Sequence, residues 1–187
     1  SAASDVYKRQ IMPDDTFYNL LLKKMVIELT YLADAGKISR DSVETLAPDI
    51  AAYCYHRAKE CIEEARPVLD DLSARYPLVL VSNFYGNIEA VLTDFNLLHY
   101  FRTIIESAVV GVRKPDPRIF ELGVEALGLK PVEVLVVGDS YKKDIVPAES
   151  IGCKVAWLKG KGWTADEDAV THSSIIKSLS ELPKAIL

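Results

Sequence analysis

The sequence predicts an α/β fold in which a parallel sheet forms the core and a helical segment precedes it. From residue 67 onward, short apolar runs rich in Val, Leu and Ile alternate with segments of helical periodicity. Such alternation is typical of β-α-β units around a sheet that is covered on both faces. Upstream, apolar residues recur at three- and four-residue steps, which indicates helices. The composition, 49% hydrophobic and 26% charged, is that of an ordinary globular protein.

The helical segment is expected to form a hairpin of two helices. The first helix is predicted over residues 14–33, with Asp14 or Asp15 capping its start. The second is predicted from about residue 39 to residue 65, with an interruption near Pro48, because proline removes a backbone donor from the helix interior. Gly36 separates the two helices, as expected of a residue that readily adopts the conformation found after a helix end.

The chain is accordingly divided into a leader of unclear origin, a helical domain and an α/β core, at residues 1–13, 14–66 and 67–187. Within the core, strands are predicted at residues 78–81, 104–110, 134–137 and 155–158, and helices at residues 87–95 and 117–127, before residue 151 and from about residue 173 to the end.

Charge and cysteine usage exclude several classes of protein. The formal net charge of -5 and the lack of a basic stripe argue against a nucleic-acid-binding protein. No apolar run reaches the roughly 18 residues that a membrane-spanning helix needs. Cys54, Cys61 and Cys153 are scattered without the short spacing of zinc sites, which favours a reduced, cytoplasmic protein. The oligomeric state is left open.

Polar residues follow three of the predicted strands. Ser82 and Asn83 come directly after the first strand, Lys114 lies in the loop after the second, and Asp139 and Asp144 follow the third. Ligands of open parallel sheets bind beyond the carboxyl ends of the strands, so these side chains are the first candidates for a site. Each has an ordinary structural explanation when taken alone: a turn pair, a solvated charge or a helix cap.

As a set, these side chains are the parts of a site for phosphoryl transfer. A phosphate dianion needs hydrogen-bond donors and positive charge around its oxygens, which Ser82 and Lys114 supply. A magnesium ion needs hard carboxylate oxygens while it keeps several waters, and Asp139 and Asp144 supply those. The sequence therefore predicts that a hydroxyl, an ammonium group and two acids converge at one edge of the sheet.

Three segments carry a family resemblance. Residues 78–83, Leu-Val-Leu-Val-Ser-Asn, resemble motif II of the haloacid dehalogenase-like (HAD) hydrolase superfamily. Residues 113–117, Arg-Lys-Pro-Asp-Pro, resemble motif III, and residues 136–140, Val-Val-Gly-Asp-Ser, with Asp144, resemble motif IV. The resemblance implies a Rossmann-like parallel sheet core with a small helical cap, the latter matching the predicted helical domain.

The same resemblance implies an activity and a role for each site residue. It implies a Mg²⁺-dependent phosphatase that acts on a small phosphorylated metabolite through an aspartyl-phosphate. Ser82 would bind the transferring phosphoryl group with Asn83 beside it, and Lys114 would neutralise its charge. Asp139 would hold Mg²⁺, with Asp144 as a second or water-mediated ligand.

One motif of that family is missing. Family members begin with an apolar strand that ends in Asp-x-Asp, where the first acid is the nucleophile and the second the general acid and base. Residues 1–10 contain no apolar strand, and Asp14-Asp15-Thr16 lacks the spacing residue between its acids and instead suits a helix start. We interpret the first core strand and the nucleophile as absent, and expect this chain alone to be inactive or nearly so.

Three other readings stay open at this stage. A metal-independent haloacid dehalogenase is the nearest rival enzyme, although the paired acids favour the magnesium form. A signalling receiver domain uses similar groups, but there the lysine follows the acids, whereas Lys114 precedes Asp139. A non-catalytic HAD-like binding protein is the third, because the nucleophile is missing.

Overall fold

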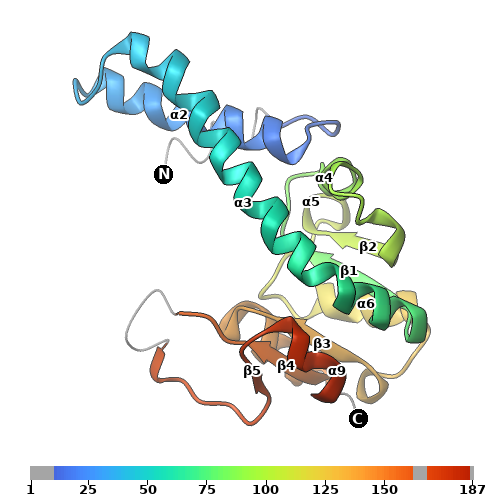
Figure 1. The fold of residues 1–187 in the computed structure, drawn as a ribbon. Coiled ribbons are helices and arrows are strands. Elements are labelled where there is room, and N and C mark those ends of the chain that lie inside the picture. The colour runs from blue at the N-terminus through green and yellow to red at the C-terminus, as the bar shows by residue number, and fades with distance from the viewer. Residues whose placement is uncertain (1–10, 162–167, 186–187) are drawn as a thin grey trace. The chain divides into compact units, whose positions relative to one another are not determined.

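The computed structural model describes residues 11–161 and 168–185 (Figure 1). The chain forms two compact units: residues up to Glu64 with Phe84–His99, and Ala65–Asn83 with the residues from Tyr100 onward. Most of the predicted leader lies outside the described residues. We refer to the two parts as the helical unit and the sheet unit.

The helical unit begins with α2 (Phe17–Asp34), whose start differs from the prediction. Thr16 caps it, since the Thr16 hydroxyl accepts a hydrogen bond from the Asn19 amide at 3.3 Å. Capping by Asp14 or Asp15 is therefore wrong: Asp15 is buried, where its carboxylate pairs with Lys23 and accepts the Met12 amide at 2.7 Å.

Helix α3 (Arg40–Arg75) is continuous, so the interruption predicted near Pro48 is also wrong. A proline removes one intrahelical hydrogen bond, but packing along the rest of a helix outweighs that loss. Ala47 and Ala51 are almost fully buried in the helical unit, and Leu72 is buried in the sheet unit. The helix thus runs past the boundary that was expected at residue 66.

The helix α4 (Ile88–Asp94) groups with the helical unit, whereas the sequence assigned it to the core. The ring centre of Phe95 lies 5.3 Å from that of Phe17, and the side-chain nitrogen Nδ2 of Asn87 donates to the Asp15 backbone carbonyl at 2.9 Å. Aromatic burial and a buried hydrogen bond between segments far apart in sequence explain a grouping that local patterns do not reveal.

The sheet unit contains all five strands of the described residues and the remaining helices (Figure 1). The strands are β1 (Leu78–Ser82), β2 (Phe101–Glu106), β3 (Leu135–Gly138), β4 (Lys154–Leu158) and β5 (Ile175–Ile176). The helices are α5 (Ser107–Val110), α6 (Arg118–Leu127), a π-helical turn (Tyr141–Ile145), α7 (Val146–Ser150) and α9 (Leu182–Ala185). Short 3-10 turns occur at Leu98–Tyr100, Pro131–Glu133 and Leu179–Glu181.

Two of the predicted segments form other structures. The strand expected at residues 104–110 ends at Glu106, which lies opposite Ser82 at the end of β1, and the next four residues form α5. Without a partner strand beyond this point, the chain turns into a helix that satisfies its own backbone. In place of the closing helix expected from residue 173, the described residues form the short strand β5, the 3-10 turn Leu179–Glu181 and the α-helix α9.

Every strand pair is parallel, which confirms the predicted α/β class with a parallel sheet. The strands form two separate sheets, however, with orders β1-β2 and β3-β4-β5. One face packs on a cluster that includes Ile119, Phe120 and Ile145, and the other packs on Leu72 and Leu182. Both faces of the strands are therefore covered by apolar side chains.

An apolar groove of about 390 Å³ separates β1 from β3. It is lined along its length by residues of both strands, with α6 side chains on one face and α3 and α9 side chains on the other. Among residues 11–161 and 168–185, β1 pairs with β2 alone and β3 with β4 alone, so one backbone edge of each strand faces the groove. Apolar strands of parallel sheets are usually buried, yet Val137 is 37% exposed here.

The sequence also predicts a reduced, cytoplasmic protein without a membrane-spanning helix. In the described part of the chain, no helix is both long and apolar enough to cross a bilayer. All three cysteines are free thiols, and burial raises the pKa of Cys153. The cytoplasmic location stays a prediction.

The position of the core can be tested at Ile119, whose side chain is fully buried. We expect Ile119→Ala to lower the free energy of unfolding of the sheet unit by about 2–5 kcal/mol, because it removes buried methylene groups and leaves a cavity. Val132→Ala, at a side chain that is 59% exposed, is the matched control and should change it by less than about 0.5 kcal/mol. Urea denaturation measures both; equal effects would contradict this assignment of the core.

Candidate active site

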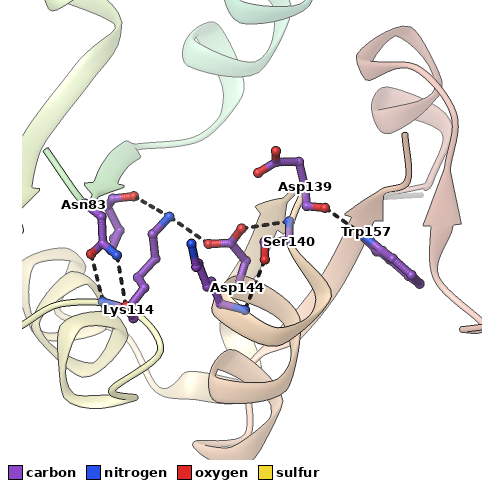
Figure 2. A network of polar contacts seen from close by, with 8 residues as sticks. Asn83, Lys114, Asp139, Ser140, Asp144 and Trp157 are labelled. Atoms are coloured by element: carbon purple, nitrogen blue, oxygen red, sulfur yellow. Dashed lines mark hydrogen bonds and ion pairs between the residues drawn. The ribbon is translucent and has the colours of Figure 1, made fainter. Parts of the chain in front are cut away.

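Lys114 lies in a network of polar contacts at the carboxyl edge of the strands (Figure 2). Its backbone is held by Asn83: the Lys114 amide donates to Asn83 Oδ1 at 2.8 Å, and Asn83 Nδ2 donates to the Lys114 carbonyl at 2.9 Å. Its ammonium group donates to the Val81 carbonyl at 3.3 Å and to Asp144 Oδ1 at 2.7 Å. The lysine thus joins the end of β1 to the turn that follows β3.

Asp144 is the buried partner in this pair. Its side chain is 5% exposed and that of Lys114 is 18% exposed, so the two charges are largely removed from water. The second carboxylate oxygen, Oδ2, accepts the Ser140 amide at 3.0 Å. Ser140 also caps the π-helical turn, because its hydroxyl accepts the Lys143 amide at 3.3 Å. Both oxygens of Asp144 are therefore hydrogen-bonded within the protein, as a buried carboxylate requires.

Gly138 makes room for this carboxylate. A Cβ atom at position 138 would lie 2.3 Å from Asp144 Cβ, closer than any real contact of two such atoms. The backbone at the end of β3 is thus in direct contact with Asp144, which only glycine permits. The glycine of the Gly-Asp-Ser sequence serves the packing of the site.

Asp139 is placed differently from Asp144. Its backbone carbonyl accepts the indole N–H of Trp157 at 3.0 Å, which fixes the chain where β3 ends. Its side chain is exposed, and among the residues shown in Figure 2 no dashed line reaches its carboxylate. Within the described part of the chain, no group of three or more His, Cys, Asp or Glu side chains is arranged to hold a metal ion.

Ser82 lies at the end of β1, opposite Glu106, and is half-buried. The structure thus brings Asn83, Lys114 and Asp144 into one bonded network, with Ser82 and Asp139 at the ends of the strands from which that network starts. The amide of Asn83 positions Lys114 in this arrangement. Three roles stay predictions: contact of Asn83 with substrate, binding of the phosphoryl group by Ser82, and binding of a metal ion by Asp139 and Asp144.

Three supporting residues were not assigned a role from the sequence. The Ser140 amide and the space at Gly138 serve Asp144, and the Trp157 indole serves the Asp139 backbone. Trp157 is 18 residues from Asp139 and belongs to β4. A backbone hydrogen bond across neighbouring strands leaves no trace in local spacing. For Gly138, its position directly after an apolar run was a usable signal of close approach.

The strands are parallel, helices alternate with them, and the polar groups lie at the carboxyl ends of the strands. The chain is therefore an α/β protein with its candidate site where this class binds ligands. A model of the haloacid dehalogenase-like hydrolase family matches residues 12–152. The chain belongs to this family. The resemblance seen in the three sequence segments is thereby confirmed.

Individual relatives agree with this assignment. The chain is 36% identical over 104 residues to haloacid dehalogenase-like hydrolase domain-containing protein 3 of Danio rerio, covering 56% of this chain and 43% of the relative. It is 37% identical over 67 residues to a phosphoserine phosphatase of Thermus thermophilus, covering 36% of this chain and 27% of the relative. The chain spans less than half the length of these relatives.

Solved structures agree on the fold. The structure of the proposed HAD hydrolase YfnB from Bacillus subtilis, bound to magnesium, superposes with a TM-score of 0.56 at 20% identity. The match covers 97% of this chain and 88% of the other. At this level of identity the match supports the HAD-like fold.

The space at Gly138 is tested by Gly138→Ala. We expect this change to lower the free energy of unfolding of the sheet unit by about 1–3 kcal/mol, because the new methyl group must displace Asp144 or the β3 backbone. Gly160→Ala is the matched control, since nothing lies within 4 Å of a Cβ atom at Gly160. A melting temperature of Gly138→Ala equal to that of Gly160→Ala would show that Asp144 does not pack as described.

The Lys114–Asp144 pair is tested by a double-mutant cycle. We expect Lys114→Met to cost about 3–5 kcal/mol, because it leaves a carboxylate buried without its cation. Adding Asp144→Asn should recover most of this loss, since a neutral amide oxygen still accepts the Ser140 amide. Denaturant titrations of the single and double variants give the coupling free energy, and strictly additive effects would argue against a direct ion pair.

Proposed function

We propose that this protein is a Mg²⁺-dependent phosphatase that hydrolyses a small phosphomonoester through an aspartyl-phosphate. The observation that carries the proposal is the ammonium group of Lys114, held between the Val81 carbonyl at the end of β1 and the buried Asp144. A fixed cation at the carboxyl ends of parallel strands is placed where a transferring phosphoryl group needs stabilisation.

The neighbouring side chains complete this phosphoryl site in the proposal. The Ser82 hydroxyl donates a hydrogen bond to one phosphoryl oxygen, and Lys114 neutralises the charge on another. Asn83 acts as a positioning residue, because both ends of its amide bond the Lys114 backbone. Groups that are held in place before the substrate arrives need no reorganisation during the reaction.

The carboxylates at this edge suit Mg²⁺. The exposed carboxylate of Asp139 offers hard oxygens, and Mg²⁺ in phosphoryl-transfer sites is commonly bound by one or two carboxylates, waters and substrate phosphate. Asp144, whose two oxygens already bond Lys114 and Ser140, would support the ion through water. When bound, Mg²⁺ supplies positive charge to the phosphoryl oxygens.

The nucleophile has to come from another carboxylate, because Asp139 and Asp144 are assigned to the metal. We propose that it is brought by an apolar strand that occupies the groove between β1 and β3. Leu78 and Leu135, at the starts of these strands, pack on one cluster, and Lys114 joins their ends. The two strands therefore run in the same direction, and a strand parallel to both would end beside Lys114.

The chemistry follows from that placement. A carboxylate oxygen at the end of the added strand attacks phosphorus, and the bond from phosphorus to the ester oxygen breaks as that oxygen takes a proton from the second acid of the Asp-x-Asp pair, which later accepts a proton from the attacking water. Water then cleaves the aspartyl-phosphate, which releases inorganic phosphate and restores the carboxylate. The helical unit is proposed as the cap of this family.

A phosphorylated metabolite is the proposed substrate class. The name of the Thermus thermophilus relative, a phosphoserine phosphatase, supports it. That relative and this chain match over a part of each only, so the particular substrate is not carried over.

The test is complementation of the purified chain with a synthetic peptide of five apolar residues followed by Asp-x-Asp. Alone, the chain should hydrolyse p-nitrophenyl phosphate no faster than its Lys114→Met variant. With the peptide, we expect Mg²⁺-dependent turnover that rises saturably with peptide concentration and disappears on addition of a chelator.

Two control peptides make this test specific. A peptide with Asn in place of the first Asp should compete for the groove and give no turnover, because it lacks the nucleophile. A peptide with Pro in the centre of the strand should do neither, since it lacks a backbone donor. Turnover by the chain alone at a rate typical of enzymes would refute the need for an added strand, and peptide binding without turnover would favour the non-catalytic alternative.

A further inference from the structure

A second pocket, of about 390 Å³, lies at the carboxyl ends of the three-stranded sheet. The residue directly after each strand lines it: Asp139 after β3, Lys159 after β4 and Lys177 after β5. All of them belong to the sheet unit. Because three adjacent parallel strands each contribute the residue at their carboxyl end, the pocket occupies the position where this class of fold binds ligands.

The lining of this pocket is strongly basic. It contains four lysines, and we call it the lysine pocket: Lys142, Lys159, Lys161 and Lys177. Among its described lining residues, Asp139 is the sole acid. The chain as a whole carries a formal net charge of -5, so this concentration of positive charge runs against the composition. A concave site lined by one sign of charge focuses the electrostatic potential on a ligand of the opposite sign.

One of the four lysines, Lys159, is held in place at the side of the pocket. The Lys159 ammonium group donates to the carbonyls of Asp168 and Val170 and lies 5.0 Å from the ring centre of Trp157. Trp157 in turn packs against Tyr141, with 5.1 Å between ring centres. The aromatic pair is largely buried and supports the Lys159 side chain.

Within the described residues, the ammonium groups of Lys142, Lys161 and Lys177 form no hydrogen bond or ion pair. They face one pocket together with the held cation of Lys159. Bringing like charges together is unfavourable, and an anion in the pocket would relieve that repulsion while accepting charge-assisted hydrogen bonds.

We propose that the lysine pocket binds a second anionic group of the substrate, a carboxylate or a phosphate. This inference rests on the proposed function, because Asp139 belongs both to this pocket and to the proposed phosphoryl site. A substrate that extends from one site to the other carries its ester phosphate beside Lys114 and its second anionic group among the lysines. The substrate class is thus a phosphomonoester with a further negative charge, not the ester of a neutral alcohol.

Binding to the pocket is tested without turnover. In a Trp163→Phe background, Trp157 is the remaining tryptophan, and its fluorescence reports on the lysine pocket. Titration of the 187-residue chain with pyrophosphate in the presence of a chelator should give a saturable change. We expect Lys142→Gln with Lys177→Gln to weaken this binding at least about tenfold, because two charge-assisted hydrogen bonds are lost.

Two matched controls come from the same elements. Lys143 adjoins Lys142 in the π-helical turn but does not line the pocket, and Lys154 lies at the opposite end of β4. Lys143→Gln and Lys154→Gln should each keep the affinity within about twofold, since general surface charge contributes little at moderate salt. Equal weakening by pocket and control variants, or a titration without saturation, overturns the proposal.

The substrate class has its own measurement. With Mg²⁺ present, 3-phosphoglycerate should bind at least about tenfold more tightly than glycerol 3-phosphate, which lacks the carboxylate. The Lys142→Gln and Lys177→Gln pair should abolish this preference. Equal affinities in the unmodified chain would overturn the assigned class. Pyrophosphate binding that persists when peptide complementation gives no turnover would reject the phosphatase function alone, whereas turnover without pyrophosphate binding would reject the lysine pocket alone.

Discussion

The ion pair between Lys114 and Asp144 is the interaction on which the candidate site depends. Two charges that are largely removed from water are stable only with close partners, and each has them: Lys114 bonds the Val81 carbonyl and Asp144, which also accepts the Ser140 amide. The pair joins the ends of two strands that have no hydrogen bonds to each other. Its geometry also explains why the chain has glycine at position 138 and why the Asn83 amide bonds the backbone of Lys114.

The groove between β1 and β3 is mostly apolar, in contrast to this charged pair. Its two backbone edges have no partner strand within the described residues, and helices cover both of its faces. Exposed strand edges readily pair with another strand, which is the reason for proposing that a strand occupies this groove. The proposed nucleophilic strand satisfies the unpaired edges and the catalytic requirement together, because its carboxyl end would lie beside Lys114.

The proposed phosphoryl site and the lysine pocket share Asp139, and this has a consequence for specificity. The sheet unit has its own basic pocket at the ends of β3, β4 and β5. Recognition of a second anionic group by the sheet unit would select among phosphomonoesters by charge, before any contribution from the helical unit.

The sequence by itself determined the parallel α/β class, most strand positions and the family, because apolar runs, turn residues and short motifs such as Gly138-Asp139-Ser140 are local patterns. Tertiary structure decided what depends on distant partners. It kept α3 helical through Pro48, since packing outweighs one lost hydrogen bond, and it placed α4 with the helical unit through Phe17 and Phe95. It separated β1 from β3 and engaged both oxygens of Asp144, because strand pairing and burial are set by neighbours that spacing along the chain does not specify.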